Sequence, residues 1–187
     1  MNKVKKSRLK IEYPQFHMKS GEKSPRPNIR NVLFVCNGNI YRSFSAECLL
    51  KHYLNGHNIK GWEVFSAGTT AKKQKIDSET IIKLKALGVK DVRHKQHKLN
   101  KSMLKRFDLV IAMAEDQIDF MKKKFNYTHA VLFNKLASDK KRSIGDISDN
   151  VKDYMNNRTS VKKEINRTIQ YIHDSIPGLI RGINKLL

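Results

Sequence analysis

A cysteine and an arginine flank a short turn that follows an apolar run in the chain. Residues 32–35 are apolar and mostly β-branched or aromatic, which predicts a buried strand of a parallel sheet. Cys36 ends this strand, and Arg42 stands beyond the turn. A thiolate is a strong nucleophile, and a planar guanidinium can bind two phosphoryl oxygens at once. The pattern therefore predicts a loop that binds a phosphoryl group and attacks it.

The turn itself is made of residues that accept unusual backbone angles. Gly38 tolerates a positive φ, and the flanking Asn37 and Asn39 accept left-handed conformations better than most residues. Amides in such a turn can point inward and form an anion-binding nest. Apolar residues then recur at helical spacing from Ser43 to about residue 55, so the loop opens a helix. The N-terminus of a helix favours both an oxyanion and a thiolate.

A structural role for the cysteine is the alternative. A lone cysteine at the end of a buried strand is most often a small core hydrophobe. The loop arginine and the hydroxyl of Ser43, placed between a strand and a helix, make a far more specific pattern than Cys36 alone. The combination favours chemistry over packing.

Residues 32–43 resemble the signature of the low-molecular-weight protein tyrosine phosphatases, whose loop reads Cys-x-Gly-Asn-Ile-Cys-Arg-Ser, and only Tyr41 departs from it. Three later segments are similar to family motifs in the family's order: Ser66-Ala67-Gly68-Thr69, His94-Lys95-Gln96-His97-Lys98-Leu99 and Phe107-Asp108-Leu109-Val110-Ile111-Ala112-Met113. The likeness covers about residues 31–175. It implies a cysteine-dependent phosphatase that needs no metal and no cofactor and forms a phosphocysteine intermediate.

The resemblance also implies a role for each residue of the loop. Cys36 is the expected nucleophile, and Arg42 with the loop amides is expected to bind the phosphoryl oxygens. Asn39 is expected to hold the conformation of the loop, and the Ser43 hydroxyl to donate to the thiolate. The expected substrate-binding residues are Asn37, Gly38, Asn39, Ile40, Tyr41 and Ser43.

A leaving group must be protonated as the phosphoryl group moves to sulfur, and a carboxyl group is the expected donor. The family carries this acid in an Asp-Pro-Tyr segment, and Asp149 stands in the corresponding place. We expect Asp149 to be the general acid, with Asp146 as the alternative. Both carboxylates could instead cap a loop or a helix, because aspartates near glycine and serine commonly do so.

Departures from the family limit the chemistry. Many members carry a second cysteine, which can trap the oxidised nucleophile as a disulfide, where this chain has Tyr41. Cys48 is the only other cysteine, and its place in the apolar pattern of the first helix predicts a core residue. Arsenate reductases of the same fold need further redox cysteines, so that activity is not expected.

The substrate is less closely defined by the sequence. Tyrosine-specific members line the entrance with aromatic side chains that this chain lacks, although Tyr41 or Tyr154 could replace them. Members that act on phosphoarginine tend to carry threonine where this chain has Ile40. We therefore expect a protein tyrosine phosphatase acting on a phosphorylated protein or a small phosphomonoester, with phosphoarginine as an alternative substrate.

A second class of function rests on charge. The chain has a net charge of +21, and residues 1–30 carry nine Lys or Arg against two Glu. Such a charge attracts anionic partners, so a basic protein that binds nucleic acid or an anionic surface is the alternative. Nucleic acid is not favoured, because no basic motif interleaved with aromatics appears. A solvated Lys-rich surface would give the same composition.

The alternation of strand and helix patterns predicts a single α/β domain over residues 31–187, preceded by a basic, flexible arm over residues 1–30. We expect a central parallel sheet of about four strands, flanked by helices on both faces, with the site at the carboxyl ends of the strands. Predicted strands lie near 31–35, 62–66, 108–113 and 130–133, and predicted helices near 43–55, 77–88, 100–106, 115–125 and 158–175. Pro177 is expected to end the last helix.

The expected location is the cytoplasm. The two cysteines favour a reducing compartment, and no apolar run approaches the length of about 18 residues that a transmembrane helix requires. The basic start of the chain is followed by no apolar segment typical of a signal peptide.

Overall fold

The computed structural model describes residues 29–186, so all but the last two residues of the predicted basic arm lie outside the described residues. The described residues form a four-stranded sheet in the order β2-β1-β3-β4, and every pair of neighbouring strands is parallel. The strands are β1 (Asn31–Cys36), β2 (Glu63–Gly68), β3 (Leu109–Ala112) and β4 (Val131–Leu132). The predicted α/β fold with a parallel sheet is confirmed.

Parallel pairing brings the carboxyl ends of the strands to one edge of the sheet. In the register of β1 with β2, Cys36 lies opposite Gly68, and in the register of β1 with β3, Val35 lies opposite Ala112. The loops that leave these strands therefore meet at this edge. In open parallel sheets this edge is where ligands bind.

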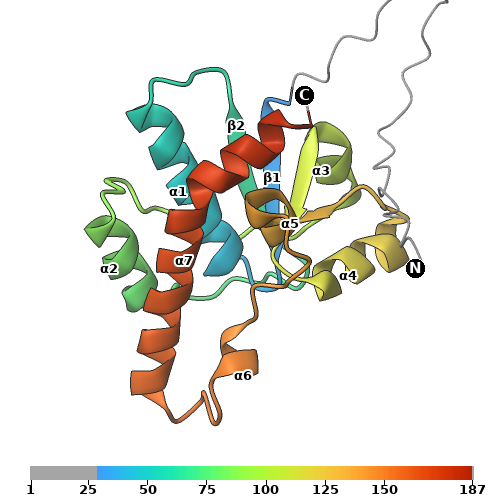
Figure 1. Cartoon of the computed structure of the whole chain (residues 1–187). Coiled ribbons are helices and arrows are strands. Elements are labelled where there is room, and N and C mark those ends of the chain that lie inside the picture. The colour runs from blue at the N-terminus through green and yellow to red at the C-terminus, as the bar shows by residue number, and fades with distance from the viewer. Residues whose placement is uncertain (1–28, 187) are drawn as a thin grey trace, which may run out of the picture.

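Helices cover both faces of the sheet, as Figure 1 shows. They are α1 (Arg42–Gly56), α2 (Ser78–Ala86), α3 (Lys101–Arg106), α4 (Glu115–Phe125), α5 (Phe133–Ser138), α6 (Ile147–Asn150) and α7 (Arg158–Asn184). Val32 and Phe34 of β1 pack into one apolar cluster with α1, α5 and α7, whereas Leu33 and Val35 pack into a second cluster with α3 and α4. Within residues 29–186, no helix combines the length and the hydropathy that crossing a membrane requires.

The predicted start of the second helix is confirmed, because Asp77 caps α2 by accepting a hydrogen bond from the amide of Glu79 at 2.9 Å. The predicted end of the last helix at Pro177 is wrong. Helix α7 continues through Pro177 to Asn184. Two glycines explain why: a Cβ at Gly178 or at Gly182 would collide with carbonyl oxygens of α5. The close packing of α7 against α5 stabilises turns that the missing N–H of proline weakens.

Candidate active site

Residues 36–43 form a loop that joins β1 to α1 and surrounds a buried thiol. Only 2% of Cys36 is exposed, and its sulfur lies 2.9 Å from the hydroxyl oxygen of Ser43. The amide of Asn39 donates to the same sulfur at 3.3 Å. Helix α1 begins at Arg42, so its N-terminal turn lies beside the loop. A thiolate at Cys36 would accept hydrogen bonds from the Ser43 hydroxyl and from the Asn39 amide.

Asn39 holds the loop in shape from within. Its backbone is left-handed, with a φ of 54°, and its side chain is fully buried. The side-chain amide donates to Ser43 at 3.1 Å and to Ser66 at 2.8 Å, while its oxygen accepts the backbone N–H of His97 at 2.8 Å. The ring of His94 lies 2.6 Å from the carbonyl oxygen of Asn39 and donates to it. These contacts offset the cost of a left-handed conformation at a residue other than glycine.

Gly38 and Gly68 matter because neighbouring atoms lie close to their Cα atoms, and neither residue has a positive φ. Of the three residues expected to accept a left-handed conformation, Asn37, Gly38 and Asn39, only Asn39 has a positive φ in the structure. A Cβ at Gly38 would crowd the side chain of Ile40 at 3.2 Å. At the end of β2, a Cβ at Gly68 would collide with the carbonyl oxygen of Asn37. The loop can pack against β2 only because Gly68 has no side chain.

Arg42 is the largest fully buried side chain of the described residues, with 2% exposure. Its guanidinium donates to the carbonyl oxygen of Ile144 at 2.9 Å and forms an ion pair with Asp146. Ile144 is in turn fixed by its amide, which donates to the carbonyl oxygen of Met113 at 2.7 Å. The segment before α6 thus orients the arginine at the start of α1.

The two candidate acids stand on α6 and have different partners. Asp146 is the N-cap of α6, and its side chain is about one third exposed where it meets Arg42. Asp149 is exposed, and its carboxylate accepts the backbone N–H of Asp146 at 2.6 Å. The structure therefore brings Asp146 to the arginine, whereas Asp149 makes no hydrogen bond to Cys36 or Arg42 among the described residues. Both carboxylates form the capping box of α6.

Tyr41 does not line an entrance to the site. Its side chain is buried, with 5% exposure, and its hydroxyl donates to the backbone carbonyl of Glu164 in α7 at 3.4 Å. Burial raises the pKa of the Tyr41 hydroxyl above its ordinary value. Tyr154 is 45% exposed and lies between α6 and α7. Of the two predicted replacements for an entrance aromatic, only Tyr154 is therefore free to meet a ligand.

An outer ring of hydrogen bonds was not predicted from the sequence. The buried amide of Gln117 donates to the side-chain oxygen of Asn37 at 3.0 Å, and Thr69 donates to the same oxygen at 3.1 Å. Ser66 donates to Glu47 at 2.5 Å while it accepts from Asn39. The similarity of residues 66–69 to a family motif is the only sequence signal for this ring. Gln117 and Glu47 sit in ordinary helical patterns and carry no such signal.

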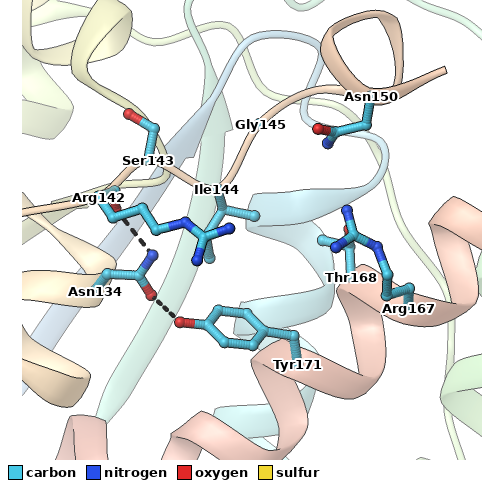
Figure 2. Close-up of a pocket in the computed structure, with 9 residues that line it drawn as sticks. All are labelled: Asn134, Arg142, Ser143, Ile144, Gly145, Asn150, Arg167, Thr168 and Tyr171. Atoms are coloured by element: carbon cyan, nitrogen blue, oxygen red, sulfur yellow. Dashed lines mark hydrogen bonds between the residues drawn. The ribbon is translucent and has the colours of Figure 1, made fainter. Parts of the chain in front are cut away.

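A cavity of about 410 Å³ lies beside the segment that orients Arg42. Figure 2 shows Arg142 and Tyr171 extending into it from facing walls, with Asn134 between them. The side chain of Asn134 donates to the backbone carbonyl of Arg142 at 2.9 Å and accepts from the hydroxyl of Tyr171 at 2.7 Å. Helices α5 and α7 thereby fix the start of the segment that reaches Ile144.

The chain matches a family model described as low molecular weight phosphotyrosine protein phosphatase over residues 31–186. A curated relative is the low molecular weight protein-tyrosine-phosphatase Ptp of Acinetobacter johnsonii. The two are 34% identical over 89 residues, which make up 47% of this chain and 59% of the length of that protein.

Solved structures with the same fold include the YwlE arginine phosphatase from Geobacillus stearothermophilus, which has a TM-score of 0.68 and 21% identity over 83% of this chain and 94% of its own. The tyrosine phosphatase Wzb from Escherichia coli, solved in complex with sulphate, has a TM-score of 0.65 and 19% identity over 85% of this chain and 99% of its own. The family model spans the whole sheet and all of the helices of the described residues, and the loop of Cys36 and Arg42 lies inside it. The chain therefore belongs to the low molecular weight phosphotyrosine protein phosphatase family.

Proposed function

We propose that the protein hydrolyses phosphomonoesters without a metal, with protein phosphotyrosine as its main substrate. The observation that carries this proposal is the environment of the Cys36 sulfur. The sulfur receives the amide of Asn39 at 3.3 Å, contacts the Ser43 hydroxyl at 2.9 Å, and lies in a loop that ends at the buried Arg42. A nucleophile and a phosphate-binding group thus share one loop.

In the first step the thiolate of Cys36 attacks phosphorus. The S–P bond forms as the bond from phosphorus to the leaving oxygen breaks. Amides of residues 37–41 and the guanidinium of Arg42 stabilise the negative charge on the phosphoryl oxygens. A guanidinium has five N–H donors, and its contacts with Ile144 and Asp146 use two of them. Further donors are therefore present for the phosphoryl group.

Asp149 is our proposed general acid. It gives a proton to the leaving oxygen in the first step, and in the second step it takes a proton from the water that attacks the phosphocysteine and breaks the S–P bond. The contacts of the neighbouring carboxylate support this choice, since Asp146 is engaged with Arg42. Asp149 is exposed, and one of its oxygens makes no hydrogen bond within the described residues. Asp149 therefore keeps an oxygen for a leaving group, whereas Asp146 is engaged with Arg42.

Phosphotyrosine is the proposed substrate and phosphoarginine the alternative, since relatives of both kinds share the fold. Phosphotyrosine is favoured because this chain has Ile40 at the position where family members that act on phosphoarginine tend to carry threonine. The side chain of Ile40 is partly buried against the core. We place the protein in the cytoplasm, because Cys36 and Cys48 are both free thiols and the proposed chemistry needs a reduced nucleophile.

The test is hydrolysis of p-nitrophenyl phosphate by the full chain in the presence of a metal chelator. We expect turnover in the wild type and loss of turnover in Cys36→Ser, with phosphate binding kept. Turnover by Cys36→Ser, or dependence of the wild type on an added metal, would overturn the proposal. A comparison of phosphotyrosine and phosphoarginine peptides then decides the substrate.

A further inference from the structure

A basic groove runs beside the loop of residues 36–43. Its walls are residues 71–76, which follow β2, and residues 92–98, and its volume is about 1040 Å³. Five lysines line it: Lys72, Lys73, Lys75, Lys95 and Lys98. No Asp or Glu stands among its lining residues. We refer to this feature as the lysine groove.

The two walls of the lysine groove are tied to each other and to the sheet. The side chain of Gln96 donates to the backbone carbonyl of Gln74 at 2.7 Å, which joins one wall to the other. The amide of Gly68 donates to His97 at 2.8 Å, and the amide of Leu99 donates back to Gly68 at 2.9 Å. The groove is thus anchored to the end of β2, where the catalytic loop also packs.

One end of the groove touches the catalytic loop. His94, which lines the groove, donates to the carbonyl oxygen of Asn39 from 2.6 Å. The side-chain nitrogen of Gln74 lies so near Gly38 that a Cβ there would be 3.3 Å from it. A chain whose phosphorylated residue enters the loop can therefore continue directly into the groove.

The charge of the lysine groove is not neutralised by neighbouring carboxylates of the described residues. All five are exposed, and none has a carboxylate partner among the described residues. Elsewhere Lys51 pairs with Glu47 at 2.5 Å. Unpaired ammonium groups gathered in a concave surface attract anions and raise their local concentration. The floor is apolar, since Ile76, Ile81 and Val92 are half-buried there.

We propose that the lysine groove binds an acidic segment of the phosphoprotein substrate, next to the residue that carries the phosphoryl group. This proposal rests on the phosphatase function proposed above and narrows it to substrates with Asp or Glu near the phosphorylated residue. Carboxylates pair with the lysines, and an apolar side chain of the same segment covers the floor. A nucleic acid fits less well, because single strands bind by stacking on aromatic side chains and the lining contains no Phe, Tyr or Trp.

The experiment compares a phosphotyrosine peptide that carries Glu residues on both sides with the same peptide carrying Gln. Two variants of equal charge change are used: Lys72→Gln with Lys73→Gln and Lys75→Gln in the groove, and Lys122→Gln with Lys123→Gln and Lys124→Gln on α4 as the control. All six of these lysines are exposed, so both variants are expected to fold. The readouts are kcat/KM for both peptides and for p-nitrophenyl phosphate, at low and at physiological salt.

We expect the wild type and the α4 control to prefer the Glu peptide by about tenfold at low salt, since several exposed ion pairs of modest strength add together. The preference should shrink with salt. The groove variant should lose the preference and keep its activity on p-nitrophenyl phosphate. Equal kcat/KM for the two peptides in the wild type, or an equal loss in both variants, would overturn the proposal.

The measurements distinguish a wrong proposal for the lysine groove from a wrong proposal for the phosphatase function. If the wild type did not hydrolyse p-nitrophenyl phosphate, the proposed phosphatase function would be wrong. Fluorescence anisotropy with the same two peptides would still measure whether the lysine groove binds the acidic segment. Loss of Glu-peptide binding in the groove variant but not in the α4 control would support the groove proposal. Unchanged binding in the groove variant would refute it. A groove variant that lost affinity for a single-stranded oligonucleotide but not for the Glu peptide would assign the groove to nucleic acid instead.

Discussion

The carboxylate of Asp146 pairs with the buried guanidinium of Arg42 across a separation of 104 residues in the chain. This pair joins the start of α1 to the start of α6. The orientation of the arginine therefore depends on α6, the element that also carries Asp149. One short helix thus links the two roles proposed above, the binding of phosphate by Arg42 and the protonation of the leaving group by Asp149.

Asp146→Asn removes the charge that faces Arg42 and leaves the shape of the side chain unchanged. We expect KM for p-nitrophenyl phosphate and for phenyl phosphate to rise by the same factor, about tenfold, because the arginine loses its orientation. Unfolding in urea should show a loss of about 1–2 kcal/mol, since the pair is only partly buried and solvent screens it. Asp119→Asn, an exposed change on α4, should alter neither quantity. A strong dependence on the leaving group in Asp146→Asn would make Asp146 the acid.

Asp149→Asn should act on protonation of the leaving group. Phenyl phosphate has a poor leaving group and p-nitrophenyl phosphate a good one, so kcat should fall by about 100-fold or more for the first and by much less for the second. KM should change little, because Asp149 makes no contact with Arg42 among the described residues. Steady-state kinetics on the two substrates measures this directly. Equal losses on both would exclude Asp149 as the proton donor.

Gly68→Ala tests the contact between the loop of residues 36–43 and β2. The new Cβ would collide with the carbonyl oxygen of Asn37, and it would lie 2.9 Å from the amide of Asn39. We expect a loss of activity of at least about 100-fold and a loss of stability of about 1–3 kcal/mol, because the loop must shift. The matched control is Gly56→Ala at the end of α1, where a Cβ meets nothing within 4 Å. Gly56→Ala should keep full activity. Full activity in Gly68→Ala as well would show that the loop does not depend on its contact with β2.

The ion pair of Asp77 with Arg158 gives a dependence of stability on pH. The hydrogen bonds from Arg158 hold the pKa of the Asp77 carboxyl below its usual range. The folded protein therefore binds this proton less readily than the unfolded chain does. The stability that the pair contributes is present above the ordinary aspartate pKa of about 4, and it is lost as pH falls through the folded value.

Asp77→Asn keeps the helix cap of α2, because asparagine is an equally good N-cap, and removes only the charge. We expect the wild type to exceed this variant in free energy of unfolding by about 0.5–1 kcal/mol at pH 7. The difference should shrink as the pH falls below the ordinary aspartate pKa of about 4. Urea titrations of both proteins across this range provide the measurement, and a difference that did not change with pH would contradict the assignment.

Local patterns in the sequence were enough to predict the sheet and the loop. The apolar run 32–35 lies in β1 and is fully buried, because only a strand covered on both faces accepts such a run. The end of α7 was predicted wrongly because the rule that proline ends a helix considers only the neighbouring residues of the chain. What keeps α7 helical past Pro177 is its contact with α5, which glycines far along the helix permit.

The contacts that build the site come from residues distant in the chain, which one sequence does not reveal. The pairing of Asp146 with Arg42 is one such contact, and the bond from Gln117 to Asn37 across 80 residues is another. Helix α6 has four residues, too few for a helical period to appear in the sequence. The left-handed residue of the loop is Asn39 rather than Gly38, because buried side-chain partners hold it there.

The most direct test of the proposed mechanism is to trap the covalent intermediate. Acid quench of the full chain during turnover of p-nitrophenyl phosphate, followed by mass spectrometry of peptides, reports which residue carries the phosphoryl group. We predict one phosphoryl group on Cys36 in the wild type and in Cys48→Ser, with more of it in Asp149→Asn because hydrolysis of the intermediate is slowed. Turnover without any phosphoryl group on Cys36, or with the group on another residue, would contradict the mechanism.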